Sequence, residues 1–305
     1  MSEVAMTESP AVPAAAARRP RRGRVAHYAL SLLLAAFFLG PLLFMFVSAF
    51  KGDELQLLAD MGSLRAFLPT GELSLQNFRD VFERASFGRA LLNSILVVGT
   101  TVLLGILVNS LFAYALARFR FRGRELLLSL VVALIVIPFE AVAVPLLLLV
   151  NQLPWFTDGA WTRGWLDSYH VQVLPFVANA FSVYLFYQFF VALPKDLEEA
   201  ALMDGAGRWR IYWSIVMPLS KPVIATVAVL QFLARWGDLL WPVMAVRGET
   251  YAPLPLAMQT FFGQFPRQWG DVMAFAALAT LPTLAVFLVF QRWFVRSAVS
   301  SAIKG

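Results

Sequence analysis

The sequence lacks cysteine and contains only two histidines, His27 and His170, among its 305 residues. Without thiols the chain can form no disulfide bond, zinc–thiolate site or cysteine nucleophile. His27 lies beside a basic N-terminus and His170 lies in a polar loop, so a histidine-based metal or catalytic site is not expected. The chain also has no GxxxxGK[ST] phosphate-binding motif. We therefore expect no catalytic residue, metal or cofactor in this polypeptide.

Charge is also scarce, because 14% of the residues are charged and 59% are hydrophobic. Soluble domains typically have about 25% charged residues. This chain has more apolar surface than one water-soluble core can bury, so its expected solvent is the lipid bilayer. The net charge of +6 comes mostly from basic residues at the ends of apolar runs. That distribution is typical of membrane proteins and does not favour a nucleic-acid partner.

The apolar residues form six runs, each long enough for the roughly 20 residues that cross a bilayer. The sequence therefore predicts an all-α integral membrane protein with six transmembrane helices. The first run ends in Val47-Ser48-Ala49, which resembles a signal-peptide cleavage site. However, it is longer than the roughly 7–15 residues of a signal-peptide apolar core, which favours an uncleaved span. The six predicted spans lie near residues 28–49, 91–117, 125–150, 171–192, 222–246 and 272–294.

The basic residues predict the orientation of these spans. Sixteen Lys and Arg residues lie in the N-terminal segment, in 118–124, in 193–221 and in the C-terminal tail, against eight in the other three connections. The positive-inside rule therefore places both termini of this multi-pass protein in the cytoplasm. Residues 1–27 are basic and rich in Ala and Pro, and we expect them to be disordered, ahead of a six-span domain over 28–305.

Two connections carry local helix signals. On the external side, residues 74–82 predict a short amphipathic helix that lies on the membrane surface or against neighbouring helices. On the cytoplasmic side, the segment 193–222 has Asp196 and Glu199 at capping-box spacing, which predicts a helix start. Gly205 and Gly207 should end that helix. A second helix should run from Arg208 to Met217, closed by Pro218 and Pro222. A rigid protrusion of this kind suits contact with a partner that delivers force.

The same segment resembles the cytoplasmic signature of ABC importer permeases. That signature reads E-A-A, then Gly, then I-x-L-P, and Met217 replaces its leucine here. The resemblance covers about residues 28–305 and favours the carbohydrate branch, with the second permease of maltose-type systems. Gly237 stands where the family more often has Asn, which puts in doubt a hydrogen bond from that position. The other matching segments are Asn93-Ser94, Ala113 to Arg118, Ile137 to Glu140, Val144 to Leu146 and Trp236 to Pro242.

The resemblance implies a type I ABC importer permease that forms a heterodimer with a second permease. It also implies an ABC ATPase dimer, which would carry the ATP and Mg²⁺, and an extracytoplasmic solute-binding protein that holds most of the specificity. The loop helix would dock into a cleft on the ATPase. Glu199 would cap that helix or meet a basic group of the ATPase, and Gly205 would supply the turn. The coupling residues implied are Glu199, Ala200, Ala201, Asp204, Gly205, Ile215 and Pro218.

Three ionisable residues, Glu140, Arg235 and Asp238, fall inside predicted spans. Each costs roughly 2.5–3.5 kcal/mol at mid-helix, so each should face protein or water. Arg235 and Asp238 are three residues apart and either neutralise each other or serve a substrate pathway. Glu140 would line a cavity, pair with Arg235 or contact the partner permease. Aromatic rings beside such groups suit a sugar, and the pathway candidates that join these three are Phe139, Tyr184, Phe232, Trp236 and Trp241.

We therefore expect an ATP-driven importer of a sugar, with sn-glycerol-3-phosphate or another sugar phosphate as the alternative substrate. A phosphate needs several cations, and Arg235 is the only basic residue that lies away from the ends of a predicted span. An ion-coupled secondary transporter is an alternative of another class, but it usually shows internal repeats, and none is evident here. An intramembrane enzyme would need paired histidines or a serine motif, which are also not evident.

Overall fold

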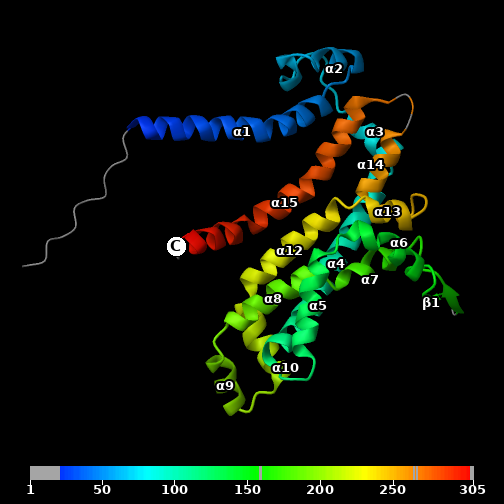
Figure 1. Cartoon of the computed structure of the whole chain (residues 1–305). Coiled ribbons are helices and arrows are strands. Elements are labelled where there is room, and N and C mark those ends of the chain that lie inside the picture. The colour runs from blue at the N-terminus through cyan, green and yellow to red at the C-terminus, as the bar shows by residue number, and fades with distance from the viewer. Residues whose placement is uncertain (1–20, 158–159, 264, 266, 303–305) are drawn as a thin grey trace, which may run out of the picture. The chain divides into compact units, whose positions relative to one another are not determined.

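A computed structural model describes residues 21–157, 160–263, 265 and 267–302 (Figure 1). Most of residues 1–27, for which disorder is expected, lie outside the described residues. Lys304, which was counted among the basic residues that predict the orientation, also lies outside them. The chain divides into two compact units, 1–44 and 45–305, and each is described by itself. The helix α1 (Arg21–Ala49) begins in the first unit and ends in the second. Its part from His27 to Ala49 is long and apolar enough to span a membrane.

In the second unit, three further stretches can span a membrane. They are α4 (Phe87–Arg118), the pair α7 (Tyr169–Val177) and α8 (Ala180–Ala192), and the part of α15 (Trp269–Ala302) up to Gln291. Two further stretches are bent. The first joins α5 (Arg124–Val136) and α6 (Phe139–Val150) at 107°. The second joins Arg208–Leu219 and α12 (Lys221–Trp236) at 76°. The described residues thus provide four spans, or six if each bent pair is one span, as the sequence predicts.

Prolines and glycine explain where the predicted spans break. Pro138 precedes α6, and Ile137 before it has an extended backbone, because a proline disfavours the helical conformation of the residue before it. The predicted fifth span, 222–246, is not one continuous helix. The helix α12 ends at Trp236, Gly237 follows, and the chain restarts as α13 (Leu240–Ala245). Glycine favours such an end because it loses more backbone freedom inside a helix than other residues do.

The helix α4 is central to the second unit and packs against α7, α8 and α12. The break between α7 and α8 is bonded to α4 by one side chain. The amide nitrogen of Asn109 donates to the Val177 carbonyl at 2.9 Å, and its oxygen accepts from the Asn179 N–H at 2.9 Å. Broken helices inside a bilayer need such partners for the freed backbone groups. The break is therefore a built feature of the fold.

A close approach of α4 to α12 depends on Gly105. Any Cβ at this position would overlap the side-chain amide of Gln231. Gln231 is buried and donates to the Ser182 hydroxyl of α8 at 3.1 Å. A glycine on α4 thus makes room for a polar contact between α12 and α8.

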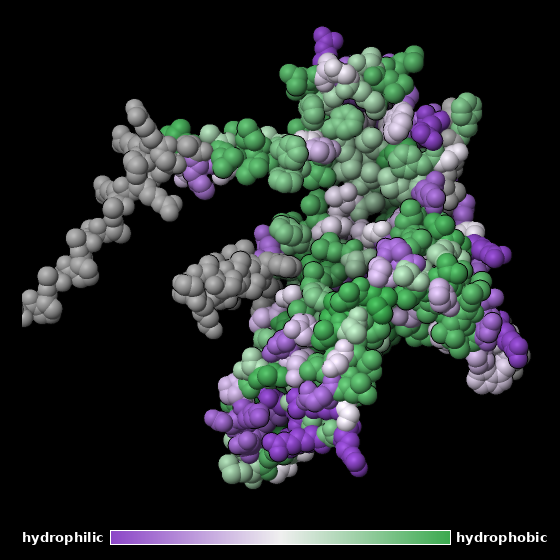
Figure 2. Space-filling view, in the orientation of Figure 1, coloured by the Kyte–Doolittle hydropathy of each residue, from purple (hydrophilic) through white to green (hydrophobic). Residues whose placement is uncertain are grey.

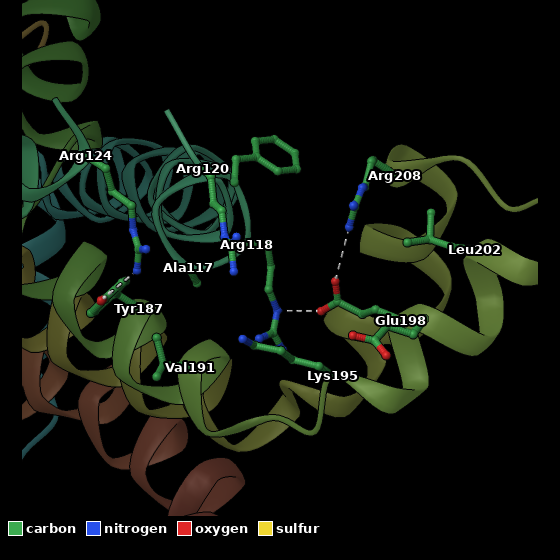
Figure 3. Close-up of a pocket in the computed structure, with 12 residues that line it drawn as sticks. Ala117, Arg118, Arg120, Arg124, Tyr187, Val191, Lys195, Glu198, Leu202 and Arg208 are labelled. Carbon is green, nitrogen blue, oxygen red and sulfur yellow. Dashed lines mark hydrogen bonds and ion pairs between the residues drawn. The ribbon is translucent and has the colours of Figure 1, made fainter. Parts of the chain in front are cut away.

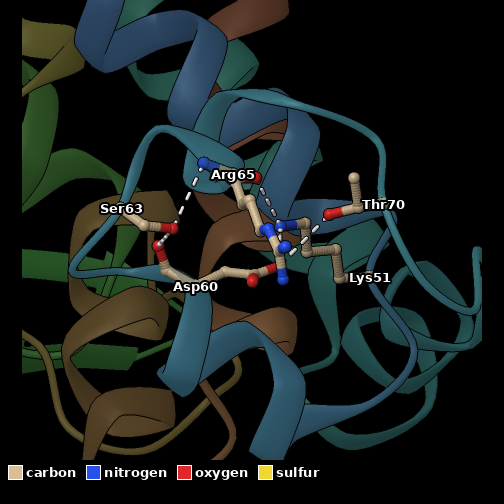
Figure 4. A network of polar contacts seen from close by, with 5 residues as sticks. All are labelled: Lys51, Asp60, Ser63, Arg65 and Thr70. Atoms are coloured by element: carbon tan, nitrogen blue, oxygen red, sulfur yellow. Dashed lines mark hydrogen bonds and ion pairs between the residues drawn. The ribbon is translucent and has the colours of Figure 1, made fainter.

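The segment after α1 is organised by a buried ion pair (Figure 4). The Lys51 ammonium lies 2.7 Å from the Asp60 carboxylate, with the two side chains 2% and 9% exposed, and it also donates to the Arg65 carbonyl. Thr70 donates to the same carboxylate at 3.3 Å. These bonds join α2 (Glu54–Asp60), η1 (Leu64–Phe67) and the chain that follows them. They hold a segment that has little apolar core of its own.

The predicted short helix is observed as α3 (Gln76–Arg84), and the Ser74 hydroxyl accepts from the Gln76 N–H at its start. Of the two predicted placements, the structure shows packing against neighbouring helices, because α3 contacts α15 and buries Val81. At the start of α15, the carboxylate of Glu54 accepts from the N–H groups of Trp269 and Gly270. A carboxylate at a helix N-terminus is stabilising.

The remaining elements lie in the connections. The strands β1 (Pro154–Thr157) and β2 (Ala160–Arg163) form an antiparallel hairpin in which Pro154 pairs with Arg163 and Thr157 with Ala160. Trp155 of this hairpin stacks on His170, with ring centroids 3.9 Å apart. The helix α14 (Leu254–Phe262) packs against α4 and α15. The segment 193–222 contains α9 (Asp196–Met203), α10 (Arg208–Ile211), the π-turn η2 (Tyr212–Val216) and α11 (Met217–Leu219).

Candidate functional site

The segment 193–222 folds as two helices joined at Gly205, as the sequence predicts. Gly205 has a φ of +81°, a left-handed conformation that favours glycine. The N–H of Gly205 donates to the Leu202 carbonyl and that of Ala206 to the Ala201 carbonyl, which satisfies the last carbonyls of α9. Hydrophilic residues gather at this end of the unit, next to α9 and α10, while the neighbouring helices show a mostly hydrophobic surface (Figure 2).

Three local predictions about this segment are wrong. No capping box forms, because Lys195 is the N-cap residue of α9 without a side-chain hydrogen bond, and Asp196 and Glu199 both lie in the first turn. Gly207 does not end α9 but precedes α10 with an extended backbone. The second helix continues past Met217 to Leu219 through the π-turn, so Pro218 lies inside it.

The hairpin formed by α9 and α10 is attached to the membrane helices through Glu198 (Figure 3). This side chain is 7% exposed, and its Oε1 lies 2.6 Å from Nε of Arg118, the last residue of α4. Its other oxygen lies 3.9 Å from Arg208 and accepts from the Tyr114 hydroxyl at 3.4 Å. Arg118 also donates to the Leu193 carbonyl after α8. One carboxylate thus joins α9, α4 and α10.

The sequence analysis missed Glu198, although a signal was present. The acid directly precedes Glu199, and Arg118 ends one of the segments that resemble ABC importer permeases. The two residues are 80 positions apart, so only the tertiary structure brings them together. In contrast, Glu199, Ala200, Asp204 and Gly205 are exposed, and of these Glu199 lines the cavity described below.

The remaining predicted coupling residues divide between the core and the surface. Ala201 and Ile215 are half-buried against the hydrophobic cluster that includes Phe190 and Tyr212, and Pro218 is exposed. The hydroxyls of Tyr212 and Ser110 lie 2.7 Å apart, which bonds the π-turn to α4. The signature residues therefore combine an outward surface with a support that is packed into the membrane helices.

A cavity of about 700 Å³ lies beside α9 (Figure 3). It is lined by five basic side chains and two acidic ones, from α9, from α10 and from the α4–α8 region. Nη2 of Arg124 donates to the Tyr187 hydroxyl at 3.3 Å, while its buried Nε has no hydrogen-bond partner among the described residues. The charged residues that line this basic cavity are Arg118, Arg120, Arg124, Lys195, Arg208, Glu198 and Glu199.

A second cavity, of about 520 Å³, lies where the broken helices α5–α6 and α7–α8 meet α12. Its wall is mostly apolar, with rings from Phe139, Phe176 and Phe181. Of the predicted pathway residues, Phe139 and Arg235 line it. The polar groups Asn179, Ser182 and Gln231 also line it and were not predicted, because each lies in an apolar stretch with no charge to mark it.

The predicted pairing of Arg235 with Asp238 is observed, with Nη1 2.9 Å from Oδ2. The guanidinium also lies over the Phe176 ring, 3.9 Å from its centroid. Arg235 therefore does not pair with Glu140, which is exposed. The expected charge balance within a membrane segment is achieved locally, on one turn of chain at the end of α12.

The other pathway candidates do not gather at this cavity. Trp241 is 1% exposed and donates to the Val171 carbonyl, so it is a core residue. Phe232 stacks on Trp236, which donates to the Ala279 carbonyl of α15. Tyr184 packs against the hydrophobic cluster around Tyr212. Within the described residues, no three His, Asp or Glu side chains could together hold a metal ion.

Residues 101–299 match the family described as binding-protein-dependent transport system inner membrane component. The chain belongs to this family. The permease is 36% identical over 219 residues to the sn-glycerol-3-phosphate transport system permease protein UgpE of Yersinia enterocolitica, covering 71% of this chain and 74% of that protein. It is 30% identical to the arabinooligosaccharides transport system permease protein AraQ of Halalkalibacterium halodurans, covering 76% and 80%.

The fold of the permease is similar to that of a bacterial ABC transporter involved in the import of the acidic polysaccharide alginate. The TM-score is 0.75 at 22% identity, over 92% of this chain and all of the other. A second match, at a TM-score of 0.55 and 18% identity, is the alginate transporter in complex with a periplasmic protein that holds an alginate pentasaccharide. It covers 88% of this chain and 93% of the other.

These findings identify a multi-pass inner-membrane permease subunit of an ABC importer, with the type I permease fold. They confirm the family that the cytoplasmic signature predicts. They give no support to the alternative of an ion-coupled secondary transporter.

Proposed function

We propose that α9 and the Gly205 turn couple this permease to ATP hydrolysis by a separate ABC ATPase dimer, which binds the ATP and Mg²⁺. The observation that carries the proposal is the contrast between Glu198 and its neighbours. Glu198 is buried in an ion pair with α4, while Glu199, Ala200 and Gly205 are exposed. A surface with a small alanine side chain can approach a partner closely, and a buried ion pair keeps its support fixed.

The anchor gives a route for force. Arg118 ends α4, and it contacts both Glu198 on α9 and the carbonyl of Leu193 just after α8. A displacement of α9 therefore acts on two membrane helices at once. Glu199 would meet a basic group on the ATPase, and Gly205 keeps the turn in the one conformation that presents both helices.

The remaining partners are a second permease and an extracytoplasmic solute-binding protein. The family description as binding-protein-dependent supports the latter. The excess of basic residues in 118–124 and 193–221 supports a cytoplasmic position for the hairpin and for both termini. In this arrangement the solute-binding protein delivers substrate at the opposite face.

For the substrate we favour a neutral sugar. The cavity between the broken helices offers amide and hydroxyl groups together with aromatic rings. Its one basic residue, Arg235, is already balanced by Asp238. A phosphate needs several charge-assisted donors, which this wall lacks among the described residues. sn-Glycerol-3-phosphate stays the second candidate, because the 36% identical relative is a permease for it.

Coupling is tested in the assembled transporter, in proteoliposomes. Glu199→Lys and Gly205→Pro should each lower uptake per ATP hydrolysed roughly tenfold or more. Glu199→Lys removes a charged contact with the ATPase, and Gly205→Pro removes the turn that supports this contact. The matched control is Glu125→Lys, which also reverses an exposed acid but lies on α5, outside the hairpin. Normal coupling in Glu199→Lys and Gly205→Pro, with the transporter intact, would remove these residues from the role.

The substrate is tested by calorimetry of the solute-binding protein with neutral oligosaccharides and with sn-glycerol-3-phosphate. Uptake of the same compounds into proteoliposomes is then compared. We expect binding and uptake of a neutral sugar. Uptake of sn-glycerol-3-phosphate alone would reverse the order of the two candidates.

A further inference from the structure

The basic cavity beside α9 holds more positive charge than the hairpin contacts use. Its five basic side chains face two carboxylates. Glu198 is already shared by Arg118 and Arg208. Within the part of the chain that the structure describes, Arg120 and Lys195 form no ion pair and no side-chain hydrogen bond. Clustered cations repel one another, so this cavity is suited to an anion.

The position of the cavity narrows the choice of anion. It lies where α4 ends, where α5 begins and near the end of α8 (Figure 3). Three membrane helices therefore leave the bilayer at its level. Basic pockets between membrane helices on the cytoplasmic side bind phosphorylated lipid headgroups. Apolar side chains line it as well, namely Phe119, Val191 and Leu202, which are 38%, 49% and 37% exposed.

We propose that this cavity binds a phosphate group, supplied by the headgroup of an anionic phospholipid. Arg120 and Lys195 provide free donors, and the buried Nε of Arg124 provides a donor that lacks a partner in the described structure. A guanidinium presents paired N–H groups that match phosphate oxygens. The volume of about 700 Å³ lies within the usual range of ligand pockets, roughly 300–1,000 Å³.

The bound phosphate bridges two segments that meet at the coupling hairpin. Arg120 belongs to the connection between α4 and α5, and Lys195 is the residue directly before α9. A phosphate held by both fixes the start of α9 against the end of α4, beside the Glu198 ion pair. Anionic lipid should therefore raise the efficiency of coupling. This inference rests on the proposed function in one respect, namely that the hairpin, and with it the cavity, lies at the cytoplasmic leaflet.

The experiment uses the assembled transporter in nanodiscs of phosphatidylcholine, with or without phosphatidylglycerol, and native mass spectrometry of retained lipid. Arg120→Gln combined with Lys195→Gln should lower phosphatidylglycerol retention by roughly fivefold for each cation removed. The matched control combines Arg122→Gln with Lys221→Gln. These two residues are exposed and lie outside the cavity, and the net charge changes equally. The control should retain lipid as the wild type does.

Two results would overturn the proposal. Equal lipid loss in both double variants would show a general effect of charge and no site. The second result has two parts: inorganic phosphate binds and raises coupling in discs of phosphatidylcholine alone, and no phosphatidylglycerol is retained in the discs that contain it. The ligand would then be a soluble anion. Gly205→Pro separates this inference from the coupling role, since it should uncouple transport and still retain phosphatidylglycerol.

Discussion

Glu198 and Glu199 are neighbours in the sequence with opposite surroundings. The first is buried between two arginines, and the second is exposed. A buried ion pair is costly to break on one side, because the remaining charge stays in a poorly solvated position. The two acids therefore offer a matched pair of substitutions that separates support of the hairpin from contact with a partner.

Glu198→Gln should lower the free energy of opening of α9 by about 3 kcal/mol, because it leaves Arg118 without its countercharge. Hydrogen–deuterium exchange over Asp196–Met203 should then be roughly a hundredfold faster. Glu199→Gln should leave exchange unchanged, since that side chain is exposed. Equal exchange in both variants would mean that the ion pair does not hold the hairpin.

Gly205 is required for its backbone angle and not for lack of space. Its φ is +81°, and nothing lies within 4 Å of a Cβ added there. Gly205→Ala should therefore destabilise the turn by about 1–2 kcal/mol, and Gly205→Asn by less, because asparagine tolerates the left-handed region.

Gly207→Ala is the control for that turn, since Gly207 has an ordinary backbone angle and equally open surroundings. It should have little effect on the exchange of α9 and α10. Similar losses for alanine at both positions would show that the angle at Gly205 is not the reason for the glycine.

The sequence allowed the helix α9 and the turn at Gly205 to be predicted, because both depend on local chemistry. It did not lead to Glu198, whose burial depends on Arg118. It also predicted a capping box at Asp196 and Glu199 that does not form, since both residues lie within the first turn of α9. Spacing fixes which side chains can meet, and the start of the helix decides whether they do.

The elements α2 and η1 depend on the ion pair of Lys51 with Asp60. The hydrogen bond from the Lys51 ammonium holds the pKa of the Asp60 carboxyl below its ordinary value. The stabilisation is therefore fully present above the ordinary aspartate pKa of about 3.9, and it is lost as the pH falls through the lower folded-state pKa. Between pH 5 and 8 the segment should be insensitive to pH.

Limited proteolysis of residues 51–70 in detergent tests this dependence. Cleavage should be unchanged between about pH 5 and 8 and should rise below about pH 4. Asp60→Asn should raise cleavage already at neutral pH, while Glu72→Gln, which removes an exposed acid nearby, should not. Pronounced cleavage of the wild type at pH 6 would contradict the assignment.

The bends between helices were only partly predictable. Pro138 marks the break between α5 and α6, but a proline does not set the angle of 107°. The break between α7 and α8 has local signals, Pro175 inside α7 and Asn179 as the side-chain cap of α8, but its partner on α4, Asn109, lies far away in the sequence and bonds both of its sides. Hydropathy finds long apolar stretches, and distant polar side chains decide where those stretches stop being one helix.

The orientation of the whole permease across the membrane can be tested with introduced cysteines. It contains no cysteine, so a single introduced thiol is a unique label. Ala206→Cys, in the turn after α9, should react with an impermeant maleimide only from the cytoplasmic side. Gly62→Cys, in an exposed position with open surroundings, should react only from outside. The reverse pattern would invert the orientation of the permease.

The family and the number of apolar stretches were predictable from the sequence, because hydropathy and the cytoplasmic signature are both local properties. The central position of α4 was not, since it depends on Asn109, Gly105 and Arg118, each of which meets residues far along the chain. Three of the predicted pathway residues, Tyr184, Trp236 and Trp241, instead pack in the core. Aromatic residues serve cavity and core equally well, so composition alone could not separate them.

The angle of 76° between Arg208–Leu219 and α12 has a mechanical consequence. Because the two helical segments meet at this angle, a displacement along the axis of the first moves the second sideways. The pivot is the Ser220 corner, whose hydroxyl and N–H both bond back to the Val216 carbonyl. A small stroke delivered at the hairpin would thus reach the far end of α12, where Arg235 lies, as lateral travel across the bilayer.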